Sequence, residues 1–153
     1  MTPPPAERDL TDLLCFAIYT ANLAFGRAYH AVLDDLGLTF TQWMVVMALW
    51  DRETETVKSL GAKLYLESNT LTPILKKLEA SGLVTRLRDR HDERQVLLSL
   101  TPAARALPLR SGMTQLIDDA GLEGDDFDRV RDAVTRVRDN LIQHAAAARS
   151  TRA

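Results

Sequence analysis

The feature that most constrains the fold is a long first segment that is apolar on nearly every face of a helix. Apolar or small residues recur at close to helical spacing over residues 10–36, and further apolar side chains fill the other faces of its first half. The first set is Leu10, Leu14, Ala17, Ala21, Ala24, Ala28, Val32 and Leu36, and the second is Leu13, Phe16, Ile18, Leu23 and Phe25. A helix of this kind must be buried on most sides. Since a chain of 153 residues has little core to surround it, we expect a second subunit to cover it.

A segment near the C-terminus also predicts association. From about residue 125, apolar residues recur at alternating steps of three and four, with Asp and Arg between them. The seam is Phe127, Val130, Val134, Val137, Leu141, His144 and Ala148. This heptad spacing is typical of helices that pair. We therefore predict a homodimer with a helical dimerisation region at residues 9–36 and 101–148, and disordered ends at residues 1–8 and 149–153.

Between these segments the pattern predicts short helices followed by two strands. Caps and apolar stripes predict helices over residues 41–53, 57–66 and 68–82, with Thr41 and Ser68 as N-caps and Gly82 as the last stop. The alternating stretches "LVTRLR" and "QVLLSL" predict strands, joined by the charged hexapeptide "DRHDER". The fold class is therefore mainly α with a small β hairpin, a winged helix-turn-helix at residues 38–100 between N- and C-terminal dimerisation helices.

A further helix is predicted after the second strand. Thr101 is a suitable cap and Pro102 a suitable first residue. Pro108 and Gly112 should kink or interrupt that helix, because proline lacks the N–H group that a helix interior uses.

This order of elements predicts an interface with double-stranded DNA. In a helix-turn-helix the second helix enters the major groove, and its first residues meet base edges. The side chains expected there are Ser68, Asn69, Thr70, Thr72 and Pro73, with Lys76 and Lys77 nearer the phosphates. The hairpin tip is expected to enter the adjacent minor groove or to grip phosphates through Arg86, Arg88, Arg90 and Arg94.

The charge distribution supports this interpretation. Residues 58–94 contain eight Lys or Arg against five Asp or Glu, a local charge of +3 in a chain of net charge −2. A lysine pair alone is usually only a solvated helix face. The complete order of helices with an arginine-rich wing favours DNA binding.

The stretch "LYLESNTLTPILKKLEASGLVTRLRDRHDERQVLLSLT" resembles the winged helix of the MarR family of transcriptional regulators. Its wing signature is present as Asp92-Glu93-Arg94, followed by a strand and "LT". The resemblance extends over about residues 8–145. It implies a repressor that binds a pseudo-palindromic operator, in which Arg94 reaches DNA and Asp92 positions the wing.

The single cysteine, Cys15, lies in the stretch "LLCFAIYTANLAFGRAY". A lone cysteine in an apolar helix is ordinarily a small buried hydrophobe. Here it is close to a helix start, where the dipole favours a thiolate, and phenolic O–H groups could stabilise that thiolate by hydrogen bonds. Tyr19 and Tyr29 each lie about 40° from Cys15 around the helix, but Tyr29 is about 21 Å away along the axis. Tyr29 can therefore meet only the Cys15 of a partner whose helix runs in the opposite direction.

The same stretch resembles the organic-hydroperoxide-sensing, OhrR-like branch of the MarR family. That resemblance implies that Cys15 is the redox-sensing cysteine and that Tyr19 and Tyr29 of the partner hydrogen-bond to it. Without a second cysteine, the two-cysteine mechanism is excluded, so oxidised Cys15 needs a low-molecular-weight thiol or over-oxidises. We predict that the hydroperoxide enters an apolar pocket lined by Phe16, Phe25, Trp43 and Met47.

Three alternatives stay open. A MarR-type repressor can instead be released by a phenolic or other small ligand held without a covalent bond. A thiol peroxidase is weaker, because we see no resolving cysteine and no second catalytic group, so we expect no enzyme. A structural dimer without a DNA role is the third.

Cofactors, metals and membranes are not expected. The three histidines, His30, His91 and His144, are scattered without metal-ligand spacing. No apolar run is long enough to cross a bilayer, and the first ten residues, "MTPPPAERDL", lack the apolar core of a signal peptide. We therefore expect a cytoplasmic protein.

Overall fold

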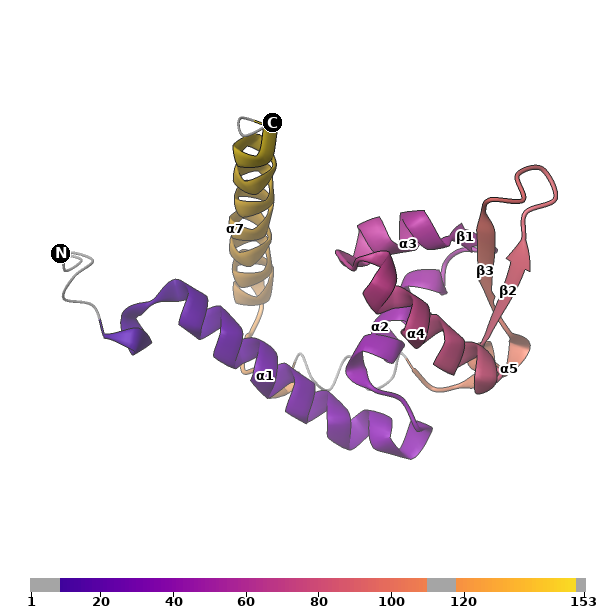
Figure 1. Ribbon diagram of the computed structural model, residues 1–153. Helices are drawn as coiled ribbons and strands as arrows, with labels where there is room; N and C mark the ends of the chain where they lie inside the picture. Colours follow the sequence, from indigo (N-terminus) through magenta and orange to yellow (C-terminus); the bar gives the residue numbers. More distant parts are fainter. Residues whose placement is uncertain (1–8, 110–117, 151–153) are drawn as a thin grey trace. The chain divides into compact units, whose positions relative to one another are not determined.

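The computed structural model of the chain describes residues 9–109 and 118–150. They belong to two units, Met1–Leu109 and Arg110–Ala153. The described chain is mainly helical with one small antiparallel sheet, as predicted (Figure 1). No single described helix is long and apolar enough to cross a membrane, although Leu14–Leu36 and Phe40–Leu49, bent by 74°, would pass as a pair by length and composition. The expectation of a disordered N-terminus at residues 1–8 lies outside the described residues.

The predicted first helix over residues 10–36 is divided into three pieces. A 3₁₀ turn, η2 (Leu10–Asp12), precedes α1 (Leu14–Leu33), and a second turn, η3 (Asp34–Leu36), follows it. The physical reason for the early break is a capping box, in which Asp9 and Asp12 each accept a hydrogen bond from the other's backbone and close the turn. Leu13 is then extended, at φ −85° and ψ 125°. Cys15 consequently lies in the first turn of α1.

Helix α2 (Phe40–Leu49) begins earlier than predicted, because Thr39 and Gln42 form the capping box and Thr41 is already helical. Its side chains Trp43, Val45, Val46 and Leu49 are buried in the core of the first unit. Helix α3 (Val57–Leu64) follows the cap Thr56. The second and third predicted helices are thus confirmed, with shifted ends.

Helix α4 (Ser68–Ala80) has the predicted amphipathic face. Leu71, Leu75 and Leu78 are buried, and the polar residues face away from the core. Ser68 is the first helical residue and not the cap, which is Glu67. Pro73 lies just past the first turn, where its missing N–H leaves only the carbonyl of Asn69 without its usual helical donor. Gly82, at φ +71°, ends the helix as predicted.

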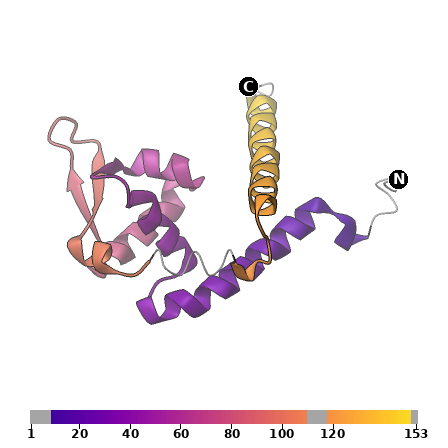
Figure 2. The same cartoon turned by 180° about the vertical axis from the view of Figure 1, so that it is seen from behind.

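The described residues form one sheet of three strands in the order β1-β3-β2. Strands β2 (Val84–Arg88) and β3 (Val96–Leu100) pair antiparallel, and the short β1 (Glu55–Thr56) pairs with the other edge of β3. Strand β1 was not predicted, since two residues are too few to show an alternation. The loop of the β2–β3 hairpin projects beyond the helices in both views (Figures 1 and 2).

Helix α5 (Pro102–Ala106) returns the chain to the core. Thr101 caps it by accepting a hydrogen bond from the N–H of Ala104 (3.2 Å), and Pro102 is its first residue, as predicted. The Thr101 hydroxyl also donates to the carbonyl of Gly82 (2.7 Å), which ties α5 to the end of α4. The helix ends two residues before Pro108. The predicted effect of Gly112 lies outside the described residues.

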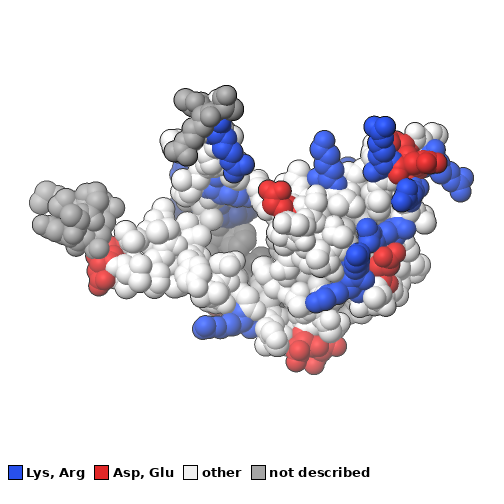
Figure 3. Space-filling view, viewed as in Figure 1, with Lys and Arg blue, Asp and Glu red and all other residues white. Residues whose placement is uncertain are grey.

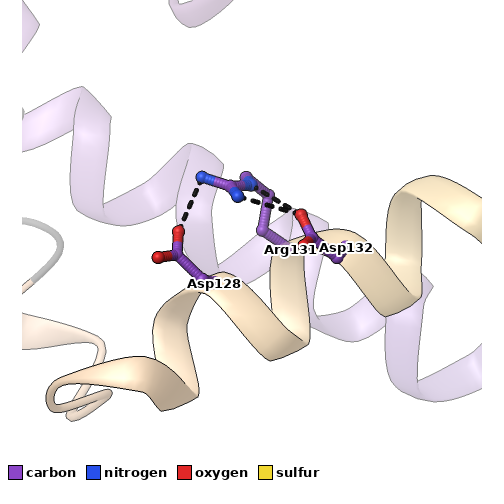
Figure 4. A network of polar contacts seen from close by, with 3 residues as sticks. All are labelled: Asp128, Arg131 and Asp132. Atoms are coloured by element: carbon purple, nitrogen blue, oxygen red, sulfur yellow. Dashed lines mark hydrogen bonds and ion pairs between the residues drawn. The ribbon is translucent and has the colours of Figure 1, made fainter.

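The second unit contains α7 (Asp125–Ser150), the predicted last helix. Asp residues lie in its first turn and Arg149 lies in its last turn. The helix dipole favours this arrangement, because it stabilises negative charge at the N-terminus and positive charge at the C-terminus. Arg131 lies 2.7 Å from Asp128 and 2.9 Å from Asp132 (Figure 4), and these carboxylates raise the pKa of its guanidinium, the hydrogen bond to Asp132 most of all. The seam residues Val130, Val134 and Leu141 are exposed. The predicted tail begins too early, because residues 149 and 150 are still helical.

Candidate functional site

The outer face of α4 presents the side chains that were predicted to meet DNA. Ser68, Asn69 and Thr70 are exposed in its first turn, and Pro73, Lys76 and Lys77 are exposed further along. Thr72 is half-buried. The buried leucine stripe fixes the rotation of the helix, and with it the direction of this polar face. Figure 3 shows Lys and Arg side chains over the region of α4 and around the β2–β3 hairpin, with Asp and Glu among them at the hairpin tip.

The wing loop, residues 89–95, is organised by carboxylates. One oxygen of Asp92 accepts from the N–H of Arg94 and the other from the side-chain amide of Gln95, both at 3.1 Å. The N–H of Gln95 donates back to the carbonyl of Asp92 at 2.9 Å. A carboxylate of Asp89 accepts from the N–H of His91 at 2.9 Å. The Arg94 backbone is thus held by Asp92, while Arg88, Arg90 and Arg94 are exposed.

Arg86 is the exception among the predicted wing residues. It lies in the middle of β2, opposite Leu98, and not at the hairpin tip. Strand alternation puts it on the same face as the buried Val84, so its side chain is only 22% exposed and lies 3.7 Å from Glu79 of α4. Its Nε atom is buried and has no hydrogen-bond partner among the described residues. Arg86 therefore joins the sheet to α4.

Cys15 is exposed in the first turn of α1. It is the second residue of that helix, and the N–H groups of Phe16 and Ala17, which follow it, both donate to the carbonyl of Leu13 at 3.1 Å. Tyr19, one turn later, is 59% exposed. Within the protomer this cysteine is therefore not the buried hydrophobe that a lone helical cysteine usually is.

Tyr29, by contrast, is half-buried at the other end of α1. Its ring lies 4.8 Å from the rings of both Phe40 and Trp43 of α2. The indole N–H of Trp43 donates to the carbonyl of Leu109 at 3.3 Å. Burial raises the pKa of the Tyr29 phenol above its ordinary value of 10.0, so the phenol is a hydrogen-bond donor at neutral pH. This aromatic cluster fixes Tyr29 to α2.

The predicted apolar pocket does not coincide with the two cavities found beside α1. Phe25 is exposed, Phe16 and Met47 are half-buried, and Trp43 is buried in the aromatic cluster. One cavity, of about 610 Å³, is lined by Asn22, Leu23, Gly26, Arg27, His30, Ala31 and Phe40. The second, of about 480 Å³, shares Gly26, His30 and Phe40 with the first. Sequence reasoning missed Arg27 and His30 as lining residues, because single polar residues on a helix carry no signal of a cavity.

Comparison with known proteins identifies the family. A family model described as Transcriptional regulator SarA/Rot matches residues 27–107. The HTH-type transcriptional regulator TtmR of Methylorubrum extorquens is 52% identical over 100 residues, which cover 65% of this chain and 51% of that protein. The Organic hydroperoxide resistance transcriptional regulator of Bacillus subtilis is 47% identical over 92 residues, which cover 60% of this chain and 63% of that one. The chain thus spans less than two thirds of the length of either relative.

A solved structure extends the likeness over most of the chain. The structure of reduced AbfR bound to DNA matches with a TM-score of 0.76 and 32% identity, covering 87% of this chain and 94% of that one. AbfR is a protein of Staphylococcus epidermidis. The predicted winged helix is therefore confirmed, and the chain belongs to the SarA/Rot family of MarR-like, DNA-binding transcriptional regulators.

Proposed function

We propose that this regulator is a homodimeric repressor that binds its operator while Cys15 is reduced and releases it after an organic hydroperoxide oxidises Cys15. The single observation that carries the proposal is the exposure of Cys15 in the first turn of α1. A cysteine in this position is accessible to an oxidant, and its thiolate is the form that reacts. The likeness to the Bacillus subtilis organic hydroperoxide resistance regulator supports the choice of oxidant.

The chemistry requires one oxidant and one thiol. The Cys15 thiolate attacks the distal oxygen of the hydroperoxide, so an S–O bond forms and the O–O bond breaks. The sulfur is oxidised to a sulfenic acid, and the reduced peroxide leaves as an alkoxide that takes a proton to become the alcohol. A low-molecular-weight thiol then attacks the sulfenic sulfur, forms a mixed disulfide and releases water. The small thiol is required because the chain has no second cysteine.

A second subunit completes the proposed sensor. Helix α1 runs without a break from Leu14 to Leu33, so Tyr29 lies about 21 Å along the axis from the Cys15 of its own chain. In an antiparallel pair of α1 helices, the Tyr29 phenol of one subunit reaches the thiolate of the other, and the symmetry makes the contact twice. Exposed apolar surface on two helices supports such a dimer, because a soluble protein usually buries a large apolar patch against a partner. On α1 this surface includes Leu14, Leu23 and Phe25, and on α7 it is the seam described above.

Release is assigned to the mixed disulfide and not to over-oxidation. Two structures of AbfR are described as bound to DNA, one reduced and one overoxidized. A separate structure is described as the disulfide-formed protein. A sulfinate adds only oxygen atoms to the sulfur, whereas a thiol adduct adds a whole side group to a packed interface. The adduct displaces the Tyr29 phenol, and the two α4 helices leave the spacing of successive major grooves. A change of about 3 kcal/mol in operator binding corresponds to more than a hundredfold in affinity.

The test is operator binding at one fixed salt concentration, with cumene hydroperoxide and a small thiol such as cysteine. Wild type should release the operator, and Cys15→Ser should hold it under the same treatment. If both proteins hold the operator, Cys15 is not the sensor. Peroxide consumption is measured in parallel: one equivalent per subunit agrees with a sensor, and repeated turnover would indicate a thiol peroxidase instead.

A second candidate function rests on the 610 Å³ cavity beside α1. Its lining includes Arg27 and His30, whose nitrogen atoms would favour an acidic or phenolic ligand. In that case a bound ligand releases the operator without a covalent step. Salicylate as the probe should then release wild type and Cys15→Ser equally, while Arg27→Gln should weaken its effect.

A further inference from the structure

Arg86 combines a charge with an inward position in β2. Its side chain is only 22% exposed and lies on the same face of the strand as the buried Val84. Among residues 9–109 and 118–150, its Nε is the one buried side-chain nitrogen or oxygen atom without a hydrogen-bond partner. A buried N–H without an acceptor lowers stability, and an apolar side chain of similar length would not have this cost. Packing of the core therefore does not account for an arginine at this position.

Arg86 forms an ion pair that joins two elements. Its Nη1 atom lies 3.7 Å from Oε2 of Glu79, a residue in the last turn of α4 whose side chain is 45% exposed. This distance is too long for a hydrogen bond, so the attraction is between the two charges. Glu79 lies at the end of the helix where the dipole disfavours an acid. Both residues are thus unfavourable in their own element, and each offsets the other only across the junction of α4 and β2.

Backbone contacts already fix the start of β2. The N–H of Leu83 donates to the carbonyl of Leu78 at 2.9 Å and closes the turn after α4. The Thr101 hydroxyl donates to the carbonyl of Gly82 at 2.7 Å. These contacts position the first residue of the strand, but they do not set the direction in which the hairpin extends from it.

Arg86 holds the strand at a second point. It lies two residues after Val84, about 7 Å along β2 toward the hairpin tip. The next residue on this face, Arg88, is exposed, and the loop beyond it projects past the helices (Figures 1 and 2). A contact at Arg86 therefore acts on the tilt of the wing relative to α4.

This tilt affects DNA binding because two parts of the same unit are expected to bind at once. The first turn of α4 is expected in the major groove, and Arg94 of the wing in the adjacent minor groove or at its phosphates. Asp92 holds the backbone of Arg94, so the position of Arg94 follows the direction of the hairpin. Since the widths of the two grooves are set by the duplex, a wing at another tilt misses its contacts when α4 is in its groove.

We propose that Arg86 is a positioning residue for DNA binding: its ion pair with Glu79 holds the wing at the tilt that lets Arg94 reach DNA while α4 occupies the major groove. Arg86 itself does not contact DNA. The inference rests on the proposed binding of DNA through α4 and the wing, and it is independent of Cys15. It also accounts for the orphaned N–H, because an apolar residue would pack at this position but would not attract Glu79.

The test uses the intact, reduced protein and a duplex selected from a random-sequence library by binding to the wild type. Arg86→Met keeps the approximate length of the side chain and removes its charge, and Glu79→Met does the same for its partner. Arg88→Met, two residues further along the same face of β2, is the matched control for the loss of an exposed arginine. Affinity at one salt concentration and thermal melting are measured for these variants and for the Glu79→Met, Arg86→Met double variant.

Both Arg86→Met and Glu79→Met should bind about fivefold more weakly than wild type, as expected for the loss of one partly exposed ion pair. Their charge changes are opposite, and removal of an acid would by charge alone strengthen DNA binding. The double variant should bind no more weakly than either single variant, because all three lack the same link. Arg86→Met and the double variant should melt no lower than wild type, since neither has the unpaired buried N–H.

A second readout separates positioning from direct contact with DNA. Arg94→Ala should weaken binding in the wild-type and Arg88→Met backgrounds, but much less in the Arg86→Met background, where the wing no longer reaches DNA. Lys76→Ala, which changes α4, should weaken binding by the same factor in all three backgrounds.

Four results would overturn the inference: unchanged affinity in Arg86→Met, stronger binding by Glu79→Met, a loss in the double variant equal to the product of the two single losses, or an equal effect of Arg94→Ala with and without Arg86→Met. A wild type that selects no duplex would instead refute the proposed DNA interface itself.

Discussion

Asp92 of the wing is expected to affect DNA binding in two opposite ways, through its charge and through its hydrogen bonds. Residues 88–94 carry three arginines and three acids, Asp89, Asp92 and Glu93, so the wing has no net charge when His91 is neutral. Removing the charge of Asp92 should reduce repulsion of DNA phosphates. Removing its two hydrogen bonds, to the N–H of Arg94 and the amide of Gln95, should disorder the wing. Asp92→Asn tests mainly the charge, since its amide oxygen can still accept from the N–H of Arg94 and its NH2 group can donate to the side-chain oxygen of Gln95 once that amide has turned over. Asp92→Ala removes the charge and both hydrogen bonds.

The magnitudes decide the expected result. Each hydrogen bond is worth about 1 kcal/mol at this partly exposed site, so their joint loss costs up to about 2 kcal/mol of wing order. The charge effect is about a few tenths of a kcal/mol, because water and salt screen charges on an exposed loop over a Debye length of about 8 Å. Asp92→Ala should therefore bind the operator roughly tenfold more weakly than wild type. Asp92→Asn should bind as well as wild type or slightly better.

The assay is a fluorescence-anisotropy titration of an operator duplex at two salt concentrations, with thermal melting of each protein. Both variants lose the same charge, so they should show the same salt slope, and their difference in affinity isolates the hydrogen bonds. Equal affinity of the two variants would show that the contacts of Asp92 do not position Arg94. A gain in affinity for Asp92→Ala would show that charge alone governs this residue.

The remaining predictions concern stability. A Cβ at Gly61 would lie 2.9 Å from the carbonyl oxygen of Leu66, so Gly61→Ala should lower the free energy of unfolding by about 1–3 kcal/mol, measured by urea denaturation. At Gly26, by contrast, a Cβ meets nothing within 4 Å. Gly26→Ala should therefore raise the free energy of unfolding by roughly 0.5–1 kcal/mol. Thr101→Ala removes the cap of α5 and the bond to Gly82 and should cost about 1–2 kcal/mol, while Thr101→Ser, which keeps the hydroxyl, should cost much less. Because burial raises the pKa of Tyr29 above 10.0, its contribution to stability is complete below pH 10 and is lost as the pH rises through the raised pKa; Tyr29→Phe should lack that alkaline decline in urea denaturation, and an identical decline in both proteins would contradict the assignment.

The winged helix was predictable because its signals are local and repeated. The leucine stripe of α4, the cap at Thr101 and the alternation of β2 and β3 each depend on neighbouring residues, and each is present in the structure. The early break of residues 10–36 was missed because apolar spacing continues through it, while the capping box of Asp9 and Asp12 ends the first turn. The break places Cys15 in the first turn of α1.

Arg86 shows why the wing could be predicted better than its individual contacts. The sequence offers four arginines in and beside one hairpin, and charge alone does not separate them. The alternation along β2 distinguishes Arg86 from the other three. Arg86 lies two residues after the buried Val84, on the same face of the strand, while its neighbours Thr85 and Leu87 are exposed on the other face. The same alternation was visible in "LVTRLR" and would have put Arg86 on the inner face. The cavities beside α1 had no such signal, because they depend on how α1 meets the start of α2.

The proposed sensor has a physical consequence for the dimer. A cysteine and a tyrosine about 21 Å apart on one straight helix cannot meet in a folded monomer, however well that monomer folds. Tyr29 is meanwhile fixed to α2 through Phe40 and Trp43, and α2 belongs to the same core as α4, the helix proposed to enter the major groove. In the proposed homodimer, each thiolate–phenol bond therefore joins one subunit's Cys15 to the other subunit's helix-turn-helix. Oxidation, which modifies Cys15, and dilution, which separates the subunits, should then break the same contact between Cys15 and Tyr29. An oxidised, thiol-modified protein should therefore lose operator affinity and dimer stability together.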